Sequence, residues 1–251
     1  MAEATTVSPA APPLDLLRGA ALFLDFDGTL VELAPTPDAV MIDDRLARLL
    51  TLLSQRLGRR VAIISGRPVA ALRELLPLPL FAVGSHGMEF GAADGPIDMA
   101  ARPDVLADVL ERMRRLAAQC PGVIVEDKPL GAALHYRQAP QAEAACRAVA
   151  SALAAEHELQ LQPGKMMIEV RASGGDKGTA IERLMREPEL RGARPVFMGD
   201  DLTDEPGFAA AARLGGTGIL IGDERPTEAR FRLQDVDAAI AWLEAAAAQV
   251  E

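Results

Sequence analysis

The sequence predicts an α/β protein in which a small α+β domain is inserted into a doubly wound core built on a parallel sheet. Three short apolar runs, Ala21–Leu24, Val61–Ile64 and Pro195–Met198, have the length and composition of parallel strands buried on both faces. The middle of the chain instead alternates helices with hairpins, which is typical of a separate two-layer module. Leu80–Val83 and Gly218–Ile221 are further, less regular candidates for core strands.

The connection between the first two strands is predicted to be a helix. The apolar residues there recur at helical spacing, at Leu46, Leu49, Leu50, Leu53 and Leu57. Gly58 suits the end of this helix. A strand, a helix and a strand at this spacing form a βαβ unit, the building block of a doubly wound sheet.

The predicted insert spans residues 88–171 and interrupts a core formed by residues 14–87 and 172–251. Its sequence alternates two helices with two pairs of strands, and Pro163-Gly164 is expected to join the last pair. Helices are expected at 103–120 and 141–157, and strands at 123–128, 133–137, 159–162 and 165–171. After the insert, the sequence from Asp176 begins another helix and the alternation of strand and helix resumes.

One face of the small sheet is predicted to be apolar and the other polar, because side chains in a strand change face at every residue. Val125 and Ile168 fall on the apolar face, which suits two covering helices. Glu126, Lys128 and Glu169 fall on the opposite face, which also carries His135 and Arg137. From the pattern alone, this mixed-charge face is as well explained by exposure to solvent as by ligand binding.

Composition narrows the class of protein. The net charge of −10 argues against nucleic acid or an anionic membrane as a partner. No apolar run is long enough to span a bilayer, and residues 1–13 lack the pattern of a signal peptide and are expected to be a flexible tail. Cys120 and Cys146 form no CxxC pair and are expected to be reduced thiols. We therefore expect a cytoplasmic protein, and expect it to be a monomer.

Polar side chains follow several of the predicted core strands. Two aspartates and a Gly-Thr turn end the first apolar run, and "ISGRP" and "GDDLTDE" follow two others. Loops at the carboxyl ends of parallel strands build the site in open α/β sheets. The side chains expected to meet there are Asp25, Asp27, Ser65, Lys177, Asp200, Asp201 and Asp204. So many carboxylates would repel one another unless a hard cation lay among them, and Mg²⁺ with a phosphate fits that requirement.

Each of these segments taken singly has a simpler explanation. Asp25 and Asp27 could lie on a solvated turn, Ser65 could cap a helix, and Lys177 could be a surface lysine. The acidic run from Asp200 to Asp204 could be a capped turn or a calcium loop. The joint pattern, in this order and beside the strands, is what favours a site.

In order, "DFDGTL", "ISG", Lys177 and "GDD" resemble the four motifs of the haloacid-dehalogenase-like phosphatases. Within that superfamily, "GDDLTDE" and the insert's "VEDKPLGAALHYR" and "PGKMMIEVR" resemble the trehalose-6-phosphate phosphatase family. The resemblance covers nearly all of the chain after Leu14. It implies a Rossmann-type core, a mobile cap at the insert, a sugar phosphate as substrate and Mg²⁺ as cofactor.

The resemblance also implies a role for each core residue. Asp25 would be the nucleophile that forms an aspartyl-phosphate, and Asp27 would protonate the leaving sugar oxygen and then activate water. Ser65, Gly66 and Arg67 would hold the phosphoryl group with Lys177. Mg²⁺ would be bound by the side chains of Asp25 and Asp200 and by the backbone carbonyl of Asp27. Asp201 and Asp204 would orient Lys177 and metal-bound water. Thr29 is expected to hydrogen-bond Asp27 or to cap the following turn.

For the cap, the resemblance implies that Glu126, Lys128 and Glu169 grip the distal glucose. Arg137, His135 and His86 are secondary candidates, and a core histidine satisfied by backbone is the simpler explanation of His135. Other open alternatives are a phosphatase of sucrose phosphate or glucosylglycerol phosphate, a phosphomutase and a non-catalytic sugar-phosphate-binding domain. The last would require a broken motif, and no core motif is broken here.

Overall fold

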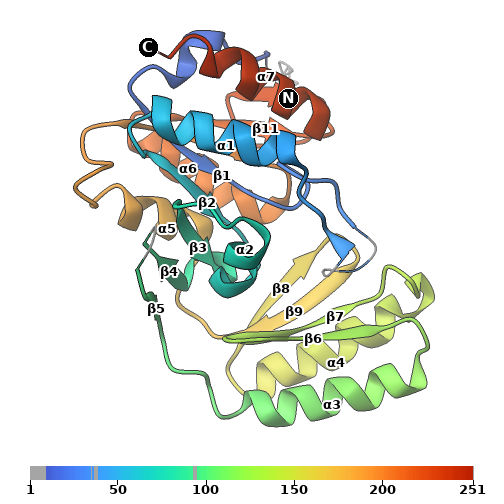
Figure 1. Cartoon of the computed structure of the whole chain (residues 1–251). Coiled ribbons are helices and arrows are strands. Elements are labelled where there is room, and N and C mark those ends of the chain that lie inside the picture. Colours follow the sequence, from blue (N-terminus) through green and yellow to red (C-terminus); the bar gives the residue numbers. More distant parts are fainter. Residues whose placement is uncertain (1–9, 35, 37–38, 93–94, 251) are drawn as a thin grey trace, which may run out of the picture.

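The fold is known from a computed structural model that describes residues 10–34, 36, 39–92 and 95–250. It consists of an eight-stranded sheet flanked by helices and a smaller four-stranded sheet with two helices of its own (Figure 1). A cleft lies between the two parts. Among the described residues, no helix is both long enough and apolar enough to cross a bilayer.

The large sheet has the strand order β12-β11-β10-β1-β2-β3-β4-β5. Its strands are β1 (Ala20–Leu24), β2 (Val61–Ile64), β3 (Phe81–Gly84), β4 (Glu89–Gly91), β5 (Ile97–Met99), β10 (Arg194–Gly199), β11 (Thr217–Ile221) and β12 (Phe231–Leu233). The six strands from β12 to β3 run parallel, and β4 and β5 add an antiparallel edge. β1 and β10 lie at the centre and are almost wholly buried, because their side chains are apolar on both faces.

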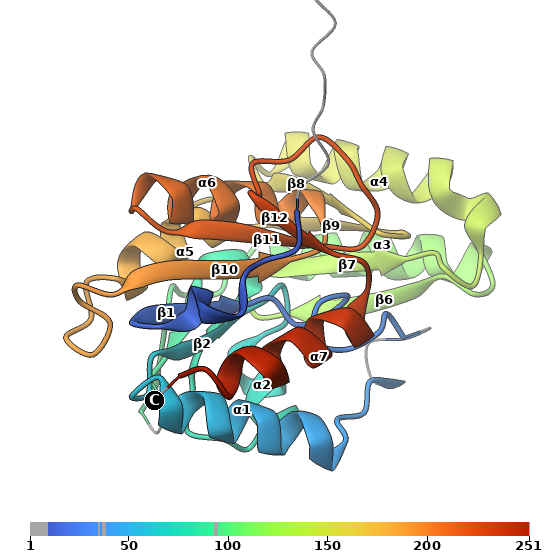
Figure 2. The same ribbon diagram turned by 90° about the horizontal axis from the view of Figure 1, so that it is seen from above.

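Helices cover both faces of this sheet (Figure 2). They are α1 (Asp44–Arg56), α2 (Val69–Leu75), α5 (Lys177–Leu184), α6 (Glu205–Arg213) and α7 (Val236–Ala247). On one face, α1, α2 and α7 pack against Leu22 and Leu24 of β1. On the other, α5 and α6 pack against Ala21 and Phe23. Alternate side chains of β1 are thus packed on both faces of the sheet, which holds the strand in place. Asp25 follows it directly and lies at its carboxyl end.

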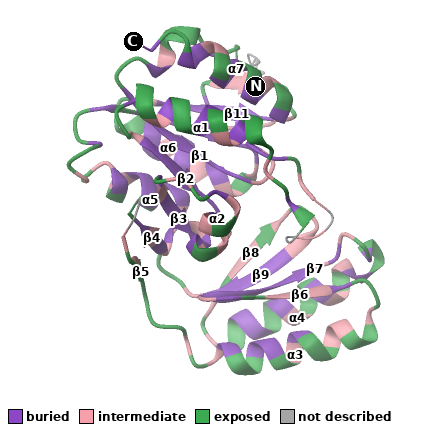
Figure 3. Cartoon of the chain, viewed as in Figure 1, coloured by how far each residue is buried: buried purple, intermediate pink, exposed green. Residues whose placement is uncertain are grey.

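The small sheet has the order β6-β7-β9-β8 and is antiparallel throughout. Its elements are β6 (Ile124–Lys128), β7 (Gly131–His135), β8 (Gln160–Gly164), β9 (Met167–Arg171), α3 (Leu106–Gln119) and α4 (Glu143–Glu156). The apolar face packs against α3 and α4, with Leu134, Ile168 and Val170 among the buried residues. The outer surfaces of α3 and α4 are exposed (Figure 3), and the polar face of the sheet turns toward the core.

Four short 3₁₀ segments complete the described structure: Leu14–Leu17, Ser85–Gly87, Pro140–Ala142 and Leu202–Asp204. The first follows residues 10–13, part of the segment expected to be a flexible tail. Trp242 Nε1 donates a hydrogen bond to the carbonyl of Pro12 at 2.9 Å, and Arg232 N donates one to Ala10. Residues 1–9 of that segment lie outside the described residues.

The predicted fold class is confirmed, and the structure differs from the local expectations in two places. β4 and β5 lie within the predicted insert yet extend the large sheet, because Glu89–Gly91 pairs with the edge strand β3. Pro163-Gly164 does not form the last turn but belongs to β8, an edge strand where proline removes no interior hydrogen bond. Lys165 and Met166 form that turn, with Met166 at φ 60°.

The division of the chain into a core of 14–87 and 172–251 and a cap of 88–171 remains a proposal. The end of β9 at Arg171 supports its second boundary, and the membership of β4 and β5 in the large sheet favours a first boundary beyond Met99.

Candidate active site

The cleft between the two sheets encloses about 940 Å³ of empty space, its open mouth included. Its floor is formed by the carboxyl ends of β1, β2 and β10 and its roof by the polar face of the small sheet. Volumes of this size accommodate small organic ligands. From the core come Asp25, Asp27, Ser65, Gly66, Arg67, His86, Lys177, Asp200 and Asp201, and from the cap come Glu126, Lys128, His135, Arg137, Gln162 and Lys165.

Asp25 lies at the bottom of the cleft, buried and held by two donors. Its backbone N–H continues the pairing of β1 with β10, and its Oδ1 accepts a hydrogen bond from Lys177 Nζ at 2.6 Å. Burial raises the pKa of Asp25 well above its usual value; Lys177 opposes this, and the carboxylates of Asp204 and Asp200 add to it. Thr29 Oγ1 donates to Asp25 Oδ2 at 3.3 Å, so the expected bond from Thr29 to Asp27 is wrong.

Lys177 is the first residue of α5 and is itself buried. Its ammonium lies between Asp25 and Asp204, with 2.5 Å to Asp204 Oδ1. Burial alone would lower the pKa of Lys177, but the two carboxylates raise it above its usual value, so the side chain stays charged. Asp204 Oδ2 accepts the backbone N–H groups of Asp200 and Asp201, each at 2.8 Å. Asp204 therefore fixes both the lysine and the loop after β10.

Three buried carboxylates form a group that suits a metal ion. Oxygen atoms of Asp25, Asp200 and Asp204 all lie within 4.8 Å of one another. Burial raises the pKa of Asp200, and Asp204 raises it further. Gly28, at φ 87°, lies so close to the Asp200 carboxylate that any side chain would collide with it. A hard cation would relieve the repulsion among these oxygens.

Asp27 is paired with Arg67 rather than with the carboxylate group. The guanidinium donates to both carboxylate oxygens, at 2.6 Å from Nε and 2.8 Å from Nη2. This is the two-pronged geometry in which arginine binds carboxylates and phosphates. Ser65 Oγ accepts the backbone N–H of Arg67 at 3.1 Å, which places the serine and the arginine at the end of β2 together.

His86 packs directly over Gly66, leaving no room there for a side chain. His86 has a left-handed backbone conformation with φ 55°, and so does Ser85 with φ 47°. A buried glutamate that sequence reasoning missed holds this loop: Glu89 accepts hydrogen bonds from the Ser85 hydroxyl and from Val69 N, the first residue of α2. Glu89 carries no local signal beyond its charge.

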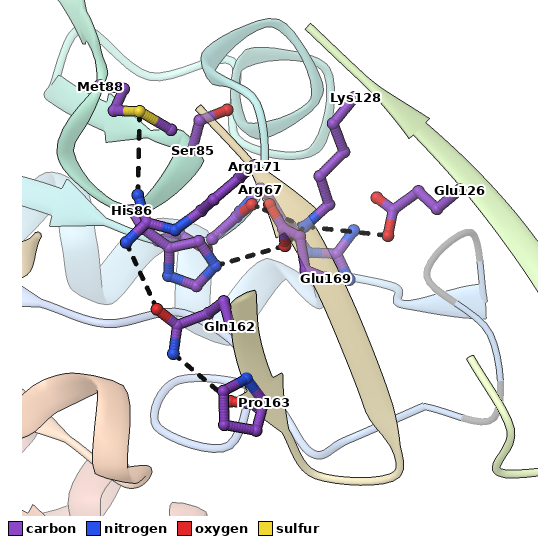
Figure 4. Close-up of polar contacts among 12 residues, drawn as sticks. Arg67, Ser85, His86, Met88, Glu126, Lys128, Gln162, Pro163, Glu169 and Arg171 are labelled. Carbon is purple, nitrogen blue, oxygen red and sulfur yellow. Dashed lines mark hydrogen bonds and ion pairs between the residues drawn. The ribbon is translucent and has the colours of Figure 1, made fainter. Parts of the chain in front are cut away.

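The polar face of the cap holds a buried ion pair (Figure 4). Lys128 Nζ lies 2.6 Å from Glu169 Oε2 and donates to the backbone carbonyl of Gly66 in the core at 3.2 Å. Although burial would raise the pKa of Glu169, Lys128 and His86 lower it to about 2. His86 Nε2 lies 3.5 Å from the same oxygen. Cap and core are thus joined through this pair.

Glu126 and His135 form a second pair on the same face. His135 Nε2 lies 2.7 Å from Glu126 Oε2, so the expectation of a core histidine satisfied by backbone is wrong. Burial opposes ionisation of Glu126, but the bond from His135 and the charge of Lys128 lower its pKa overall. The imidazole lines the cleft because His135 alternates with the buried Leu134 along β7.

Two residues of the cap, Arg137 and Lys165, make contacts that the sequence did not predict. Arg137 Nη2 donates to the backbone carbonyl of Lys165 at 3.2 Å, which supports the turn between β8 and β9. The Lys165 side chain then crosses the cleft and forms an ion pair with Asp200 Oδ2.

Asp201 lies at the mouth of the cleft, where its carboxylate accepts the backbone N–H of Leu202 at 2.6 Å. The structure therefore brings every predicted site residue to this one cleft or directly beside it.

The comparisons with known proteins agree with this geometry. A family model described as trehalose-phosphatase matches residues 23–237. The chain is 39% identical over 247 residues to trehalose-6-phosphate phosphatase of Escherichia coli, covering 97% of this chain and 91% of that protein. A probable trehalose-phosphate phosphatase of Sinorhizobium fredii is 36% identical over 209 residues, with coverages of 82% and 79%. The C-terminal domain of a Candida albicans trehalose-6-phosphate phosphatase has the same fold, with a TM-score of 0.84 at 22% identity, over 97% of this chain and 99% of that domain.

Proposed function

The chain belongs to the trehalose-phosphatase family of hydrolases, and on this premise we propose that it hydrolyses trehalose 6-phosphate to trehalose and phosphate through an aspartyl-phosphate. One observation carries the proposal beyond family membership. A charged floor suited to a phosphoryl group and a polar roof suited to hydroxyl groups face each other across a single cleft.

In the first step, an oxygen of Asp25 attacks phosphorus and the bond from phosphorus to the sugar oxygen breaks. Lys177, 2.6 Å from Asp25, favours the charged form of this carboxylate and then faces the phosphoryl oxygens. Ser65 and the N–H of Gly66 are placed at the end of β2 to hold those oxygens. Phosphoryl transfer depends on such positioning more than on other covalent help.

Asp27 supplies the proton that the departing sugar oxygen needs. In the structure its carboxylate is engaged by Arg67, so this pair must open and Asp27 must take up a proton from solvent before it can transfer one to the sugar oxygen. The entering phosphate competes for the guanidinium, since arginine binds both groups with the same two-pronged geometry. In the second step Asp27 takes a proton from water, the water oxygen bonds to phosphorus, and the bond to Asp25 breaks.

We propose Mg²⁺ as the cofactor, bound by the side chains of Asp25 and Asp200 and the backbone carbonyl of Asp27. The buried carboxylates with raised pKa values support a divalent cation at this position. When bound, the ion would neutralise charge on the phosphoryl oxygens. Asp204 already accepts hydrogen bonds from Lys177 and from two backbone N–H groups, so we assign it to positioning Lys177 and the loop after β10 rather than to binding the ion.

We propose that the roof of the cleft binds the sugar. Glu126 and Lys128 line the cleft and offer an acceptor and a donor, and hydroxyl groups need both; Glu169 lies beside the cleft and holds Lys128 in place. Arg137 then acts through the turn that it supports rather than as a sugar ligand. A monomeric state and a cytoplasmic location remain predictions from the sequence.

Release of phosphate from a panel of sugar phosphates, with and without Mg²⁺, tests the function. Trehalose 6-phosphate should be hydrolysed with the highest kcat/KM, ahead of sucrose 6-phosphate, glucosylglycerol phosphate and glucose 6-phosphate. A clear preference for another member of the panel would overturn the substrate assignment while leaving the phosphatase chemistry in place.

A further inference from the structure

The loop after β10 determines where the Asp200 carboxylate lies, so the contacts that hold this loop also shape the proposed metal site. Its inner side is held by Asp204, whose Oδ2 accepts the backbone N–H groups of Asp200 and Asp201. Gly199 lies so close to the Asp204 carboxylate that a side chain there would collide with it. These contacts are made within the loop and the end of its own strand. The outer side of the loop is held by a different part of the chain.

A second loop, residues 222–230, lies beside the loop after β10. It follows β11, which pairs in parallel with β10, so both strands end at the same edge of the sheet (Figure 2). This second loop is tied back to the sheet, because Gly222 N donates to the carbonyl of Leu233 at 3.0 Å and Arg230 N to that of Gly218 at 3.1 Å. It therefore gives its neighbour a fixed support.

Arg225 joins the two loops. Its Nη2 donates to the backbone carbonyl of Asp201 at 2.9 Å, and its Nη1 forms an ion pair with Glu205, the first residue of α6. The other carboxylate oxygen of Glu205 accepts the backbone N–H of Glu228 at 2.8 Å. The Asp201 carbonyl also accepts the N–H of Asp204 at 3.0 Å. One guanidinium thus ties the start of α6 to the peptide group that follows Asp201.

The surroundings of Arg225 favour a well-defined contact. The side chains of Arg225 and Glu205 are only 20% and 23% exposed, so their ion pair is screened less than a pair on the open surface. A carboxylate in the first turn of α6 is also stabilised by the helix dipole. Because the donors of a guanidinium form a rigid planar fork, they fix direction as well as charge. Arg225 therefore restrains the position of the loop after β10.

This restraint matters because the floor of the cleft repels its own carboxylates. Asp200 lies with Asp25 and Asp204 in the buried group, and both burial and Asp204 raise its pKa. A loosely held loop would relieve this repulsion by moving Asp200 away from the other carboxylates, and the ligands of a cation would then be misplaced. Partners that orient metal ligands typically change the affinity for the metal about 10- to 100-fold.

We propose that Arg225 is a positioning residue for the metal site. By holding the carbonyl of Asp201 against the start of α6, it keeps the Asp200 carboxylate where a divalent cation binds. This inference rests on the proposed function for the presence of the cation, but not on the identity of the sugar. Arg225 is not among the described residues that line the cleft, so it acts through the loop. It raises the affinity for the cation and takes no part in the chemistry.

Isothermal titration with Mg²⁺, without substrate, tests this role. Arg225→Ala should raise the dissociation constant of Mg²⁺ about 10- to 100-fold. Arg225→Lys keeps the charge beside Glu205 but loses the planar fork, and it should also bind Mg²⁺ more weakly than the native protein. Arg213→Ala removes an ion pair with Glu182 at the opposite end of α6 and is the matched control, which should bind Mg²⁺ as the native protein does.

The outcomes separate this inference from the proposed function. Native affinity for Mg²⁺ in both Arg225 variants would overturn the inference alone. A native protein that does not bind Mg²⁺ would overturn the proposed cofactor together with this inference.

Two further measurements distinguish positioning of the metal site from general support of the fold. On p-nitrophenyl phosphate, Arg225→Ala should need more Mg²⁺ for half-maximal activity but should approach the native rate at saturating Mg²⁺. In the metal-free protein, amide hydrogen exchange in Arg225→Ala should be faster at residues 200–204 and unchanged in β2. A lost maximal rate that Mg²⁺ does not restore, or faster exchange throughout the core, would show that the arginine only supports the fold and would overturn the proposal.

Discussion

The floor and the roof of the cleft both bury charged side chains, but they balance them differently. On the floor, Asp25 and Asp204 share the buried Lys177, Asp200 pairs with the half-exposed Lys165 of the cap, and burial raises the pKa of Asp25 and Asp200. On the roof, Glu169 has its own lysine at 2.6 Å and its pKa is lowered to about 2. The same residue types therefore stand under opposite electrostatic conditions about one cleft.

The difference matches what each wall has to bind. A floor with surplus negative charge needs a cation, and the cation then draws in a phosphoryl group. A roof whose charges are already paired keeps strong donors and acceptors ionised without attracting ions, which suits an uncharged polyhydroxyl group. Changes to the floor should therefore affect every phosphate ester, and changes to the roof only the sugar phosphate.

The largest effect is expected at the nucleophile. Asp25→Asn keeps the shape of the side chain but removes the attacking charge, so activity on all phosphate esters should fall by roughly three orders of magnitude or more. Asp44→Asn, the same change at an exposed position in α1, serves as the control. Circular dichroism should show both variants folded. Substantial turnover by Asp25→Asn would end the covalent mechanism.

Removal of the metal from the floor should lower activity nearly as strongly. EDTA should abolish phosphate release and excess Mg²⁺ should restore it, because Lys177 and Lys165 compensate the three carboxylates only in part. Asp200→Ala should resemble the chelated enzyme and should not be rescued by Mg²⁺. Isothermal titration of Mg²⁺ into the native protein and into this variant measures the site directly. Undiminished activity in EDTA would show that the carboxylates serve only the fold.

A smaller effect is expected in the stability of the roof. The folded-state pKa of Glu169, about 2, lies below its usual 4.5, so its contribution to stability is present above about pH 4.5 and is lost as the pH falls toward 2. This depression corresponds to about 3 kcal/mol. Urea unfolding should therefore find Glu169→Gln less stable than the native protein at pH 6, by an amount that shrinks below pH 4.5. A difference that does not change with pH would contradict an ionised Glu169.

The floor was predictable from the sequence to a greater extent than the roof. Runs such as Val61–Ile64 are apolar throughout, because both faces of a parallel strand are buried, and the polar residues that follow them mark the strand ends. At the edge of the large sheet, β4 has no such sequence signal. Glu89–Gly91 has only three residues, one of them a buried carboxylate, and it is a strand because it pairs with the edge of β3.

The ion pair of Lys165 depends on how the two sheets face each other, which no local pattern encodes. A lysine beside Pro163-Gly164 has the sequence signature of an exposed turn. The signal that could have found it is compositional, because lysine is rare in this chain and its three positions meet in one cleft. The pairing of His135 with Glu126 was hidden for a similar reason: alternation gives the face of a side chain but not its partner.

One ratio of activities tests most directly whether the floor binds the phosphoryl group and the roof binds the sugar. Glu126→Ala, Lys128→Ala and Glu169→Ala should each lower kcat/KM on trehalose 6-phosphate about 10- to 150-fold, the value of one charge-assisted hydrogen bond. On p-nitrophenyl phosphate, which has no sugar, the same variants should keep nearly all of the native activity. The ratio of the two activities should thus fall by that factor. Equal losses on both substrates would mean that the roof supports the fold rather than the sugar, and would contradict the account.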